Sequence, residues 1–362
     1  MRLLSKGPRV VIVTDAWLPQ VNGVVRTLIN TQQQLESLGV QTSMITPAMF
    51  STIPCPGYTE IQLSLVGSKA IEAMVEQFSP DALHIATEGP LGWAARSAAL
   101  RRGWAFTTAY HTKFPEYIHA RTGLPASWFY RLMRRFHQPS AAVLAPTRSV
   151  CSGLKEQGFS NVVLWGRGVN HDIFFPRETV RPTRIDSPVF LYAGRLSAEK
   201  NIDDFLRLDL PGEKWVVGGG PMERSLRQSY RDVRWIGVLS QHELAAVYSQ
   251  ADVFVFPSRT DTFGLVMLEA MACGLPVAAY PVAGPIDVVG SSGAGVLSED
   301  LGAAARACLE ISREKPIAHA RGFTWPQATQ QFIGALVPIR QSSQHLRSLM
   351  PRQPAGQTNS ID

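Results

Sequence analysis

Residues 189–201 read Val-Phe-Leu-Tyr-Ala-Gly-Arg-Leu-Ser-Ala-Glu-Lys-Asn. The first five are apolar or aromatic, which predicts a buried strand, and a turn at Gly194 and then a helical pattern follow. This order of strand, turn and helix is typical of parallel α/β units. Arg195 and Lys200 place two cations at the turn, beside the amino terminus of the predicted helix, where a diphosphate can bind. The alternative is that both cations pair with surface acids.

The same alternation of short apolar runs and helical patterns extends in both directions along the chain. The predicted strands are Arg9–Val13, Thr42–Ile45, Ala82–Ile85, Ala105–Ala109, Ala142–Ala145, Val189–Ala193, Trp215–Val217, Arg234–Ile236, Val253–Phe256 and Val277–Ala279. Helical patterns between such runs indicate parallel strands. We therefore predict an α/β fold of two doubly wound, Rossmann-like domains that face each other across a cleft, with ligands beyond the carboxyl ends of the strands.

A Pro- and Arg-rich stretch near the middle of the chain separates the two halves. We predict an N-terminal domain over 1–169, a linker over 170–188 and a C-terminal domain over 189–320. A helix over 321–340 is expected to pack back on the N-terminal domain, and the polar tail over 341–362 is expected to be disordered.

Composition limits the class of protein. The chain has 362 residues, 45% of them hydrophobic, which is enough for two ordered domains. Its four cysteines lie far apart, which argues against a zinc ribbon or a disulfide scaffold and suits a reducing cytosol. The first apolar run, Val10–Val13, is too short for a signal peptide, and no apolar run of 18 residues occurs. We expect a cytoplasmic protein without a bound metal or cofactor.

Basic residues are concentrated in the N-terminal half. Residues 1–168 hold 16 Lys and Arg against 9 Asp and Glu, whereas residues 169–362 hold 19 against 20. Seven basic residues and one acid, Glu116, occur within 101–135. Such a patch favours an anionic partner, either nucleic acid or an anionic membrane surface, although a solvated face has the same composition.

A second loop with charged residues follows the predicted strand Val253–Phe256. Asp261 lies in the loop and Glu269 lies about a turn and a half into the next predicted helix, with the amides of Phe263 and Gly264 between them. Carboxylates accept hydrogen bonds from vicinal hydroxyls, such as those of a sugar or a ribose. This arrangement predicts a binding site for one or both.

Together these two segments resemble the nucleotide-sugar half of the retaining glycosyltransferases of family 4, which have the two-domain GT-B fold. The family has an acid, seven residues and then Glu, with Phe-Gly inside; here Asp261 stands where Glu is usual. The Gly-Arg-Leu-Ser-x-Glu-Lys-Asn stretch matches the family's diphosphate-binding segment. Gly218-Gly-Gly-Pro221 matches its Gly-x-Gly-Pro turn.

The N-terminal half resembles the same family. Asn22 and Gly23 lie where the family has a glycine-rich loop, and a nicotinamide-type Gly-x-Gly-x-x-Gly is absent there, which counts against a dehydrogenase. His111 follows a predicted strand and matches the family's active-site histidine. Glu88 also follows a predicted strand. The resemblance implies that Gly23 helps to bind the donor and that Asn22 and Glu88 are candidates for the acceptor side.

The resemblance also implies a reaction: transfer of a hexose from a nucleotide diphosphate sugar, with retention and without a metal. Arg195 and Lys200 would neutralise the diphosphate beside Gly194 and Gly218. Asp261 would hold the sugar and Glu269 the ribose, and His111 would contact the sugar. The roles of Phe263 and Gly264 would be in donor binding.

Lipid-glycosylating members look most similar: sulfoquinovosyl- and glucosyl/glucuronosyl-diacylglycerol synthases and lipid mannosyltransferases. They share Trp165-Gly-Arg-Gly-Val-Asn170 and His111-Thr-Lys-Phe-Pro-Glu-Tyr117 with this chain. UDP-glucose or UDP-glucuronate is the favoured donor and a lipid such as diacylglycerol the favoured acceptor. The alternatives are a GDP-mannose-dependent α-mannosyltransferase, a polysaccharide glycosyltransferase and a nucleotide-sugar epimerase. A nucleic-acid-binding protein is disfavoured, because no helix-turn-helix or aromatic RNA platform occurs.

A helix predicted over Pro125–His137 carries an apolar stripe beside three arginines. The stripe comprises Trp128, Phe129, Leu132, Met133 and Phe136, and the arginines are Arg131, Arg134 and Arg135. The helix is either part of the core of the first domain or an interfacial helix on an anionic bilayer. The second possibility predicts peripheral association with the inner face of the membrane, through Trp128 and the three arginines.

Overall fold

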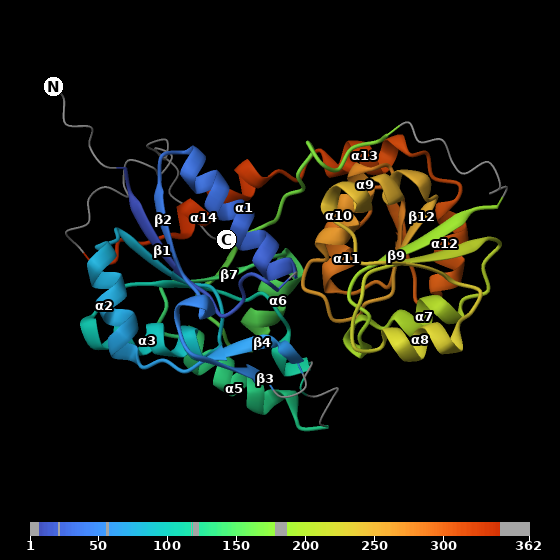
Figure 1. Ribbon diagram of the computed structural model, residues 1–362. Coiled ribbons are helices and arrows are strands. Elements are labelled where there is room, and N and C mark those ends of the chain that lie inside the picture. The colour runs from blue at the N-terminus through green and yellow to red at the C-terminus, as the bar shows by residue number, and fades with distance from the viewer. Residues whose placement is uncertain are drawn as a thin grey trace. The chain divides into compact units, whose positions relative to one another are not determined.

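The computed structural model describes residues 7–20, 22–55, 58–116, 118, 123–177 and 187–340, with the side chains of 58–60 excepted. Strands and helices alternate along most of the described chain, and all strands but β3 and β4 form two six-stranded sheets (Figure 1). Neighbouring strands pair in parallel from β2 to β7 in the first sheet and from β11 to β14 in the second. The prediction of two parallel-sheet α/β domains is confirmed.

The first sheet has the strand order β2-β1-β5-β6-β7-β8. Its strands are β1 (Arg9–Val13), β2 (Gln41–Ile45), β5 (Ala82–Ile85), β6 (Thr107–Ala109), β7 (Ala142–Ala145) and β8 (Val162–Leu164). Residues Val10–Val13 of β1 are fully buried, as expected for a central parallel strand covered on both faces. The neighbouring helices are α1 (Gly23–Ser37), α2 (Ser68–Phe78), α3 (Pro90–Arg102), α5 (Ala126–His137) and α6 (Arg148–Glu156).

The second sheet has the strand order β11-β10-β9-β12-β13-β14. Its strands are β9 (Val189–Ala193), β10 (Glu213–Val217), β11 (Arg234–Gly237), β12 (Val253–Phe256), β13 (Val277–Ala279) and β14 (Gly295–Leu297). Its helices are α7 (Ile202–Arg207), α8 (Glu223–Ser229), α9 (Gln241–Gln250), α10 (Leu265–Ala272), α11 (Ala283–Val288), α12 (Leu301–Cys308) and α13 (Glu314–Ala320). A 3₁₀ turn, η2 (Ala198–Lys200), precedes α7.

Alternate residues of β9 enter two different cores, which is why this sheet is covered on both faces. Leu191 packs in one core with residues of α9, α10 and α13. Phe190 and Tyr192 pack in the other, with residues of α7, α8 and α12. Phe174, within the predicted linker, is buried in the first of these cores, whereas 178–186 lie outside the described residues.

Three strand features were not predicted from the sequence. β8 and β14 are three-residue strands at the sheet edges, and Val163 and Leu164 of β8 are partly exposed. An antiparallel pair, β3 (Thr52–Cys55) and β4 (Tyr58–Ser64), follows the 3₁₀ turn η1 (Pro47–Met49). β8 and β14, of three residues each, are too short for a clear hydrophobic period, whereas β4 has seven residues and alternates apolar and polar residues around Ile61 and Leu63.

The chain packs as two compact units. One comprises the described residues within 7–109, 135–144 and 329–340, and the other comprises those within 110–134 and 145–328. In the first unit, the end of the described chain contacts the sheet: after α14 (Trp325–Ala335), Ile339 N donates to Asp81 O at 2.8 Å and Ile339 O accepts from Ala105 N at 3.1 Å. The predicted domain boundaries stay predictions, and the tail over 341–362 lies outside the described residues.

Helix α5 divides the predicted apolar stripe between core and surface. Phe136 is fully buried and makes an edge contact with Trp93 at a centroid distance of 5.0 Å, and Met133 is also buried. Trp128 is 59% exposed and Leu132 is exposed as well. The core interpretation therefore holds for Met133 and Phe136, and contact of the exposed part with a bilayer stays a prediction.

We expect Phe136→Ala to lower the free energy of unfolding by about 3–5 kcal/mol, because it removes a buried ring and leaves a cavity. Trp128→Ala, on the same helix, should change that free energy by less than about 1 kcal/mol, because the Trp128 side chain is mostly in water. Denaturant titration measures both variants. Equal losses would contradict the division of α5.

Candidate active site

Three loops with predicted site residues meet at the carboxyl edge of the second sheet. They follow β10, β9 and β12, which are adjacent in the sheet, so parallel pairing brings their ends together. The loop after β9 carries Arg195 and Lys200, the loop after β10 carries Gly218, and the loop after β12 carries Asp261.

The first two loops are joined backbone to backbone. Gly194 N donates to Val217 O at 3.0 Å and Leu196 N donates to Gly219 O at 2.9 Å. Gly218 has φ +130°, and a Cβ there would lie 1.9 Å from Gly194 O. Only glycine fits this approach, because a side chain would be strained and would also separate the loops.

Lys200 and Asp261 form an ion pair across the loops after β9 and β12. The Lys200 Nζ lies 2.5 Å from Asp261 Oδ1, and both side chains are partly buried. Asp261 Oδ2 is buried and accepts no hydrogen bond from the described residues. One carboxylate oxygen thus holds a cation while the other can accept from a ligand hydroxyl.

Glu269 lies in α10 and is only 5% exposed. Its helical neighbours Leu268 and Ala270 are buried in the core of the second sheet. Gly264 precedes the helix with φ +84°, a conformation that glycine allows at low cost, and Phe263 beside it is buried. A carboxylate in such surroundings requires polar partners, and a ligand hydroxyl is one candidate.

His111 follows β6 and is held by two loops of the same unit. Thr262 Oγ1 donates to His111 O at 2.6 Å, which connects the histidine to the loop of Asp261. Arg167 Nη2 lies 3.2 Å from His111 Nδ1. The Trp165 ring makes an edge contact with the imidazole at a centroid distance of 5.6 Å.

Arg167, within the Trp165–Asn170 stretch, is a further residue of this site and was not predicted as one. Its side chain is buried, and the loss of hydration lowers the pKa of the guanidinium to about 9, so that it remains charged at neutral pH. Its Nη1 donates to Trp165 O at 2.5 Å and to Gly166 O at 2.9 Å. No local pattern in the sequence pairs Arg167 with His111, because the two residues are 56 positions apart.

Asn22 and Gly23 begin α1 in the first unit. Asn22 Oδ1 accepts from Val24 N and Val25 N, each at 3.0 Å, and so caps the helix. This contact explains Asn22 as a structural residue. Its predicted place on the acceptor side, and that of Gly23 on the donor side, stay predictions.

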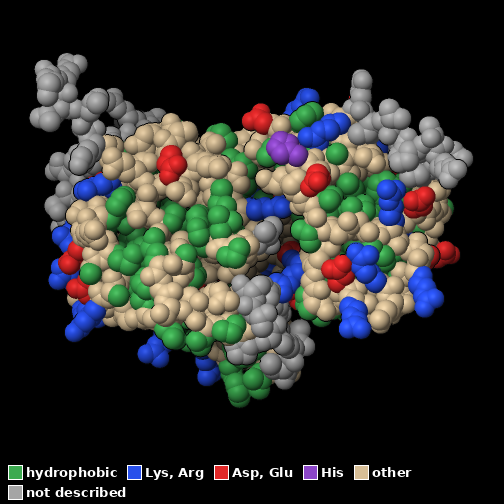
Figure 2. All heavy atoms as spheres, in the orientation of Figure 1, with side chains coloured by type: hydrophobic (Ala, Val, Ile, Leu, Met, Phe, Trp, Pro, Cys, Tyr) green, Lys and Arg blue, Asp and Glu red, His purple; other side chains and the backbone are tan. Residues whose placement is uncertain are grey.

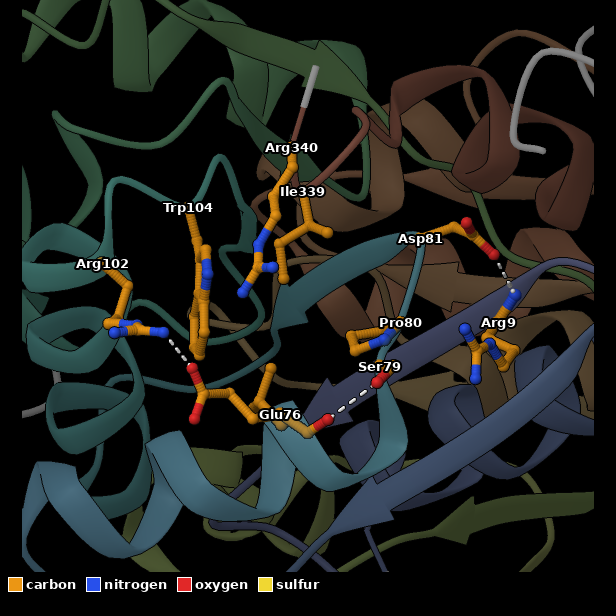
Figure 3. A pocket seen from close by; sticks show the side chains of 10 residues that line it. Arg9, Glu76, Ser79, Pro80, Asp81, Arg102, Trp104, Ile339 and Arg340 are labelled. Atoms are coloured by element: carbon orange, nitrogen blue, oxygen red, sulfur yellow. Dashed lines mark hydrogen bonds and ion pairs between the residues drawn. The ribbon is translucent and has the colours of Figure 1, made fainter. Parts of the chain in front are cut away.

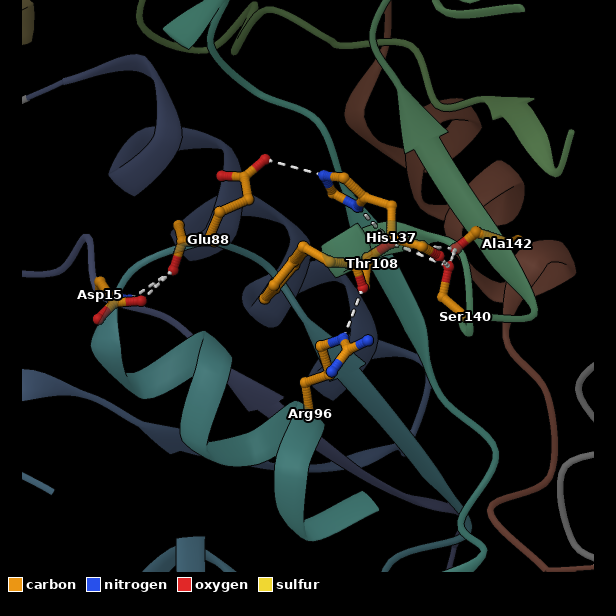
Figure 4. A network of polar contacts seen from close by, with 9 residues as sticks. Asp15, Glu88, Arg96, Thr108, His137, Ser140 and Ala142 are labelled. Atoms are coloured by element: carbon orange, nitrogen blue, oxygen red, sulfur yellow. Dashed lines mark hydrogen bonds and ion pairs between the residues drawn. The ribbon is translucent and has the colours of Figure 1, made fainter. Parts of the chain in front are cut away.

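Glu88 is held in a buried polar network of the first unit (Figure 4). Its Oε1 lies 3.1 Å from His137 Nε2, and His137 Nδ1 lies 2.9 Å from Thr108 Oγ1. Nearby, Asp15 accepts from Leu91 N, Gly92 N and the Thr87 hydroxyl. Burial raises the pKa of Asp15 despite these bonds. Asp15 and His137 were not predicted as part of this network, and the role of Glu88 toward an acceptor stays a prediction.

A hollow of about 400 Å³ lies at the amino ends of strands in the first sheet, away from the carboxyl ends of those strands (Figure 3). Arg9 and Asp81, which line it, are at the amino ends of β1 and β5. Arg102 and Arg340 lie beside Trp104, each with Cζ 5.8 Å from the ring centroid. None of the predicted site residues lines this hollow.

Two family profiles match the chain, one over each half. "Glycosyltransferase Family 4" matches residues 21–173, and "Glycosyl transferases group 1" matches residues 187–314. The chain belongs to the family-4 glycosyltransferases. The predicted resemblance is confirmed, and so is the GT-B class of fold.

Several characterised proteins are similar to this glycosyltransferase. It is 29% identical to a GDP-mannose-dependent alpha-mannosyltransferase of Mycobacterium tuberculosis, covering 92% of this chain and 97% of the relative. It is 30% identical to a sulfoquinovosyl transferase of Arabidopsis thaliana over 66% of this chain, which spans half of that relative. It is 25% identical to an alpha-monoglucosyldiacylglycerol synthase of Acholeplasma laidlawii, covering 74% and 79%.

Among solved structures, the sucrose-phosphate synthase of Thermosynechococcus elongatus has the same fold as the glycosyltransferase. The TM-score is 0.75 at 20% identity, over 90% of this chain and 97% of the other. Within the described ranges, no group of three or more His, Cys, Asp or Glu side chains is placed to hold a metal ion. In those ranges no helix has the length and apolar content needed to cross a bilayer.

We expect Gly218→Ala to destabilise the glycosyltransferase by at least about 2 kcal/mol, through positive-φ strain and the clash with Gly194 O. Gly219→Ala is the matched control. A Cβ there meets Val238 Cγ2 at 3.0 Å and Glu223 Oε2 at 3.4 Å, both side-chain ends that can move. Thermal unfolding of the two variants decides the point; equal stability would show that the two loops do not need this close approach.

Proposed function

We propose that this glycosyltransferase moves a hexose, with retention, from a nucleotide diphosphate sugar to a lipid hydroxyl such as that of diacylglycerol. UDP-glucose and UDP-glucuronate are the favoured donors. The observation that carries the proposal is the Lys200–Asp261 pair beside Arg195, at the carboxyl edge of the second sheet. It supplies cations for a diphosphate and a carboxylate for a sugar within one group of loops.

Charge on the departing diphosphate is the main electrostatic problem of this reaction. As the bond from the sugar to the phosphate breaks, negative charge builds up on the leaving oxygen. Arg195 and Lys200 would stabilise that charge, and no metal is needed for this step. When the donor binds, Lys200 would contact both the Asp261 carboxylate and the phosphate of the donor.

The two carboxylates would bind the two sugars of the donor. Asp261 Oδ2, buried and without a hydrogen bond from the described residues, is available to a hydroxyl of the transferred hexose. Glu269 would accept from the ribose hydroxyls. We assign neither of them as a nucleophile, so we favour attack by the acceptor on the face from which the diphosphate leaves, with the departing phosphate taking the acceptor proton.

A lipid acceptor is supported by one relative and by one surface. The Acholeplasma laidlawii relative is named as a diacylglycerol glucosylating enzyme. Figure 2 shows hydrophobic side chains on the surface over α5, with basic side chains beside them. Trp128 and Leu132 of α5 are exposed there. Apolar and basic side chains together suit the surface of an anionic bilayer, where such an acceptor resides.

The surface of α5 also carries the three α5 arginines, Arg131, Arg134 and Arg135, which are exposed. In the described part of the chain no carboxylate forms an ion pair with any of them. Arg101 and Arg102, by contrast, pair with Glu72 and Glu76 of α2. The anionic partner of the basic patch would therefore meet α5, and we place the enzyme on the cytoplasmic face of the membrane.

A GDP-mannose-dependent mannosyltransferase is the second candidate. It is favoured by the Mycobacterium tuberculosis relative, which aligns over 97% of its length. One experiment separates the candidates. UDP-glucose, UDP-glucuronate, UDP-galactose and GDP-mannose are each incubated with the enzyme and with diacylglycerol in anionic micelles. The masses of the products are then measured by mass spectrometry. A hexosyl lipid from a UDP-sugar supports the proposal. Mannosyl product supports the alternative, and a changed sugar nucleotide without acceptor indicates an epimerase.

We expect Arg195→Ala and Lys200→Ala each to lower kcat/KM by at least about 100-fold, or 2.7 kcal/mol, because each removes a charge-assisted contact to the diphosphate. Arg259→Ala is a control, since Arg259 pairs with exposed Glu299 on the surface. Steady-state kinetics with the active donor measure the effect. Wild-type turnover in either site variant would contradict the assignment.

We expect the protein to bind vesicles that contain phosphatidylglycerol and to bind neutral vesicles weakly, since each basic side chain near an anionic surface contributes about 1 kcal/mol. Changing the three α5 arginines to serine should reduce binding at least about tenfold, measured by vesicle sedimentation. The control changes three exposed arginines of another surface, in and after α8, to serine: Arg224, Arg227 and Arg231. Equal losses in both variants would show that only net charge matters.

A further inference from the structure

Arg167 occupies an unusual position for a cation. Its side chain is 5% exposed, and two of its hydrogen bonds go to the carbonyls of Trp165 and Gly166. The guanidinium carbon lies 4.3 Å from the centroid of the Trp165 ring. Among the described residues no Asp or Glu forms an ion pair with it. The cation is therefore held by carbonyl dipoles and an aromatic face, which fix its plane.

The fixed guanidinium faces one particular atom of His111. Arg167 Nη2 lies 3.2 Å from His111 Nδ1. A guanidinium has only donors, so in this contact Nδ1 must be the acceptor. A neutral imidazole that accepts at Nδ1 carries its proton on Nε2. A proton on Nδ1 would set two donors face to face.

Two further contacts hold the same histidine. Thr262 Oγ1 fixes the backbone carbonyl, and Trp165, on which Arg167 lies, also contacts the imidazole edge. The ring thus has one orientation relative to the loop that carries Asp261. Trp165 connects the two side chains, so a change in Arg167 would be transmitted to His111.

We propose that Arg167 is a positioning residue that holds His111 as the neutral tautomer protonated on Nε2, so that His111 acts on the donor sugar as a hydrogen-bond donor. In this state Nδ1 is occupied and is not available as a base. The proposal rests on the proposed function for the identity of the ligand, but the tautomer is a property of the protein alone. Arg167 itself need not touch substrate.

The tautomer is measured first, on the unaltered full-length protein labelled with [¹⁵N]histidine. Two-bond ¹H–¹⁵N correlation spectra at pH 7.5 report which ring nitrogen is protonated, and the spectrum of His111→Ala assigns the signals. We expect a protonated Nε2 and an unprotonated Nδ1. A protonated Nδ1 would overturn the proposal, without any variant of Arg167 being needed.

The role of Arg167 is then tested by Arg167→Met, with Arg177→Met as the matched control. Arg177 also donates to a backbone carbonyl, at 2.9 Å, and lies over an aromatic ring, Phe175, at 4.5 Å. We expect Arg167→Met to give mixed tautomers and Arg177→Met to leave the His111 signals unchanged. Unchanged signals in Arg167→Met would overturn the proposal. Should that variant not fold, Arg167→Lys keeps a cationic donor, and we expect it to retain the Nε2 tautomer. An Nδ1-protonated ring in folded Arg167→Lys would overturn the proposal.

Kinetics separate a positioning role from an independent one. We expect Arg167→Met to lower kcat/KM at least about tenfold, and His111→Ala combined with Arg167→Met to be no slower than His111→Ala alone, because Arg167 acts through the histidine. If the losses of kcat/KM in the two single variants multiply in the double variant, Arg167 acts independently of His111 and the proposal is overturned. If no donor gives sugar transfer with the unaltered protein, the proposed function fails, while the spectra still decide the tautomer.

Discussion

The close approach of the turns after β9 and β10 is the constraint on which the candidate donor site depends. Gly218 adopts φ +130° directly against Gly194 O, and a bond from Leu196 N to Gly219 O joins the turns. With any side chain at Gly218 the turns would separate. Arg195 lies between the two joined positions, so its backbone is fixed before a ligand arrives. A preorganised cation is worth more in catalysis than a mobile one, because it does not have to reorient as charge develops.

Charged groups near the site are held in two different ways. Lys200 has a carboxylate partner, Asp261, at 2.5 Å, which a diphosphate can share. Arg167 is held by carbonyl oxygens and a tryptophan ring. An ion pair at a partly exposed loop can exchange partners, whereas a buried guanidinium with fixed acceptors cannot. The first arrangement suits a residue that meets substrate, and the second suits a residue that orients another side chain.

Helix α5 is an amphipathic helix whose large apolar side chains are divided between core and surface. Its buried side, with Phe136 and Met133, belongs to the core of the first sheet. Its outer side presents Trp128 and Leu132 together with the three α5 arginines. The sequence pattern showed that the helix is amphipathic. It did not show that large apolar residues occur on both sides, because the stripe is wider than the neighbouring elements can cover.

The sequence alone determined most of the fold and the loops of the candidate donor site. Buried parallel strands are continuous apolar runs, and motif residues directly after them, such as Arg195 and Asp261, must lie at one edge of a sheet. The tertiary structure decided the pairings of His111 with Arg167 and of Glu88 with His137. These partners are 56 and 49 residues apart, and neither has a local signal. Local sequence patterns indicate which face of a helix or strand is buried. The choice of a polar partner depends instead on how close two loops lie in space, and a local pattern does not contain that distance.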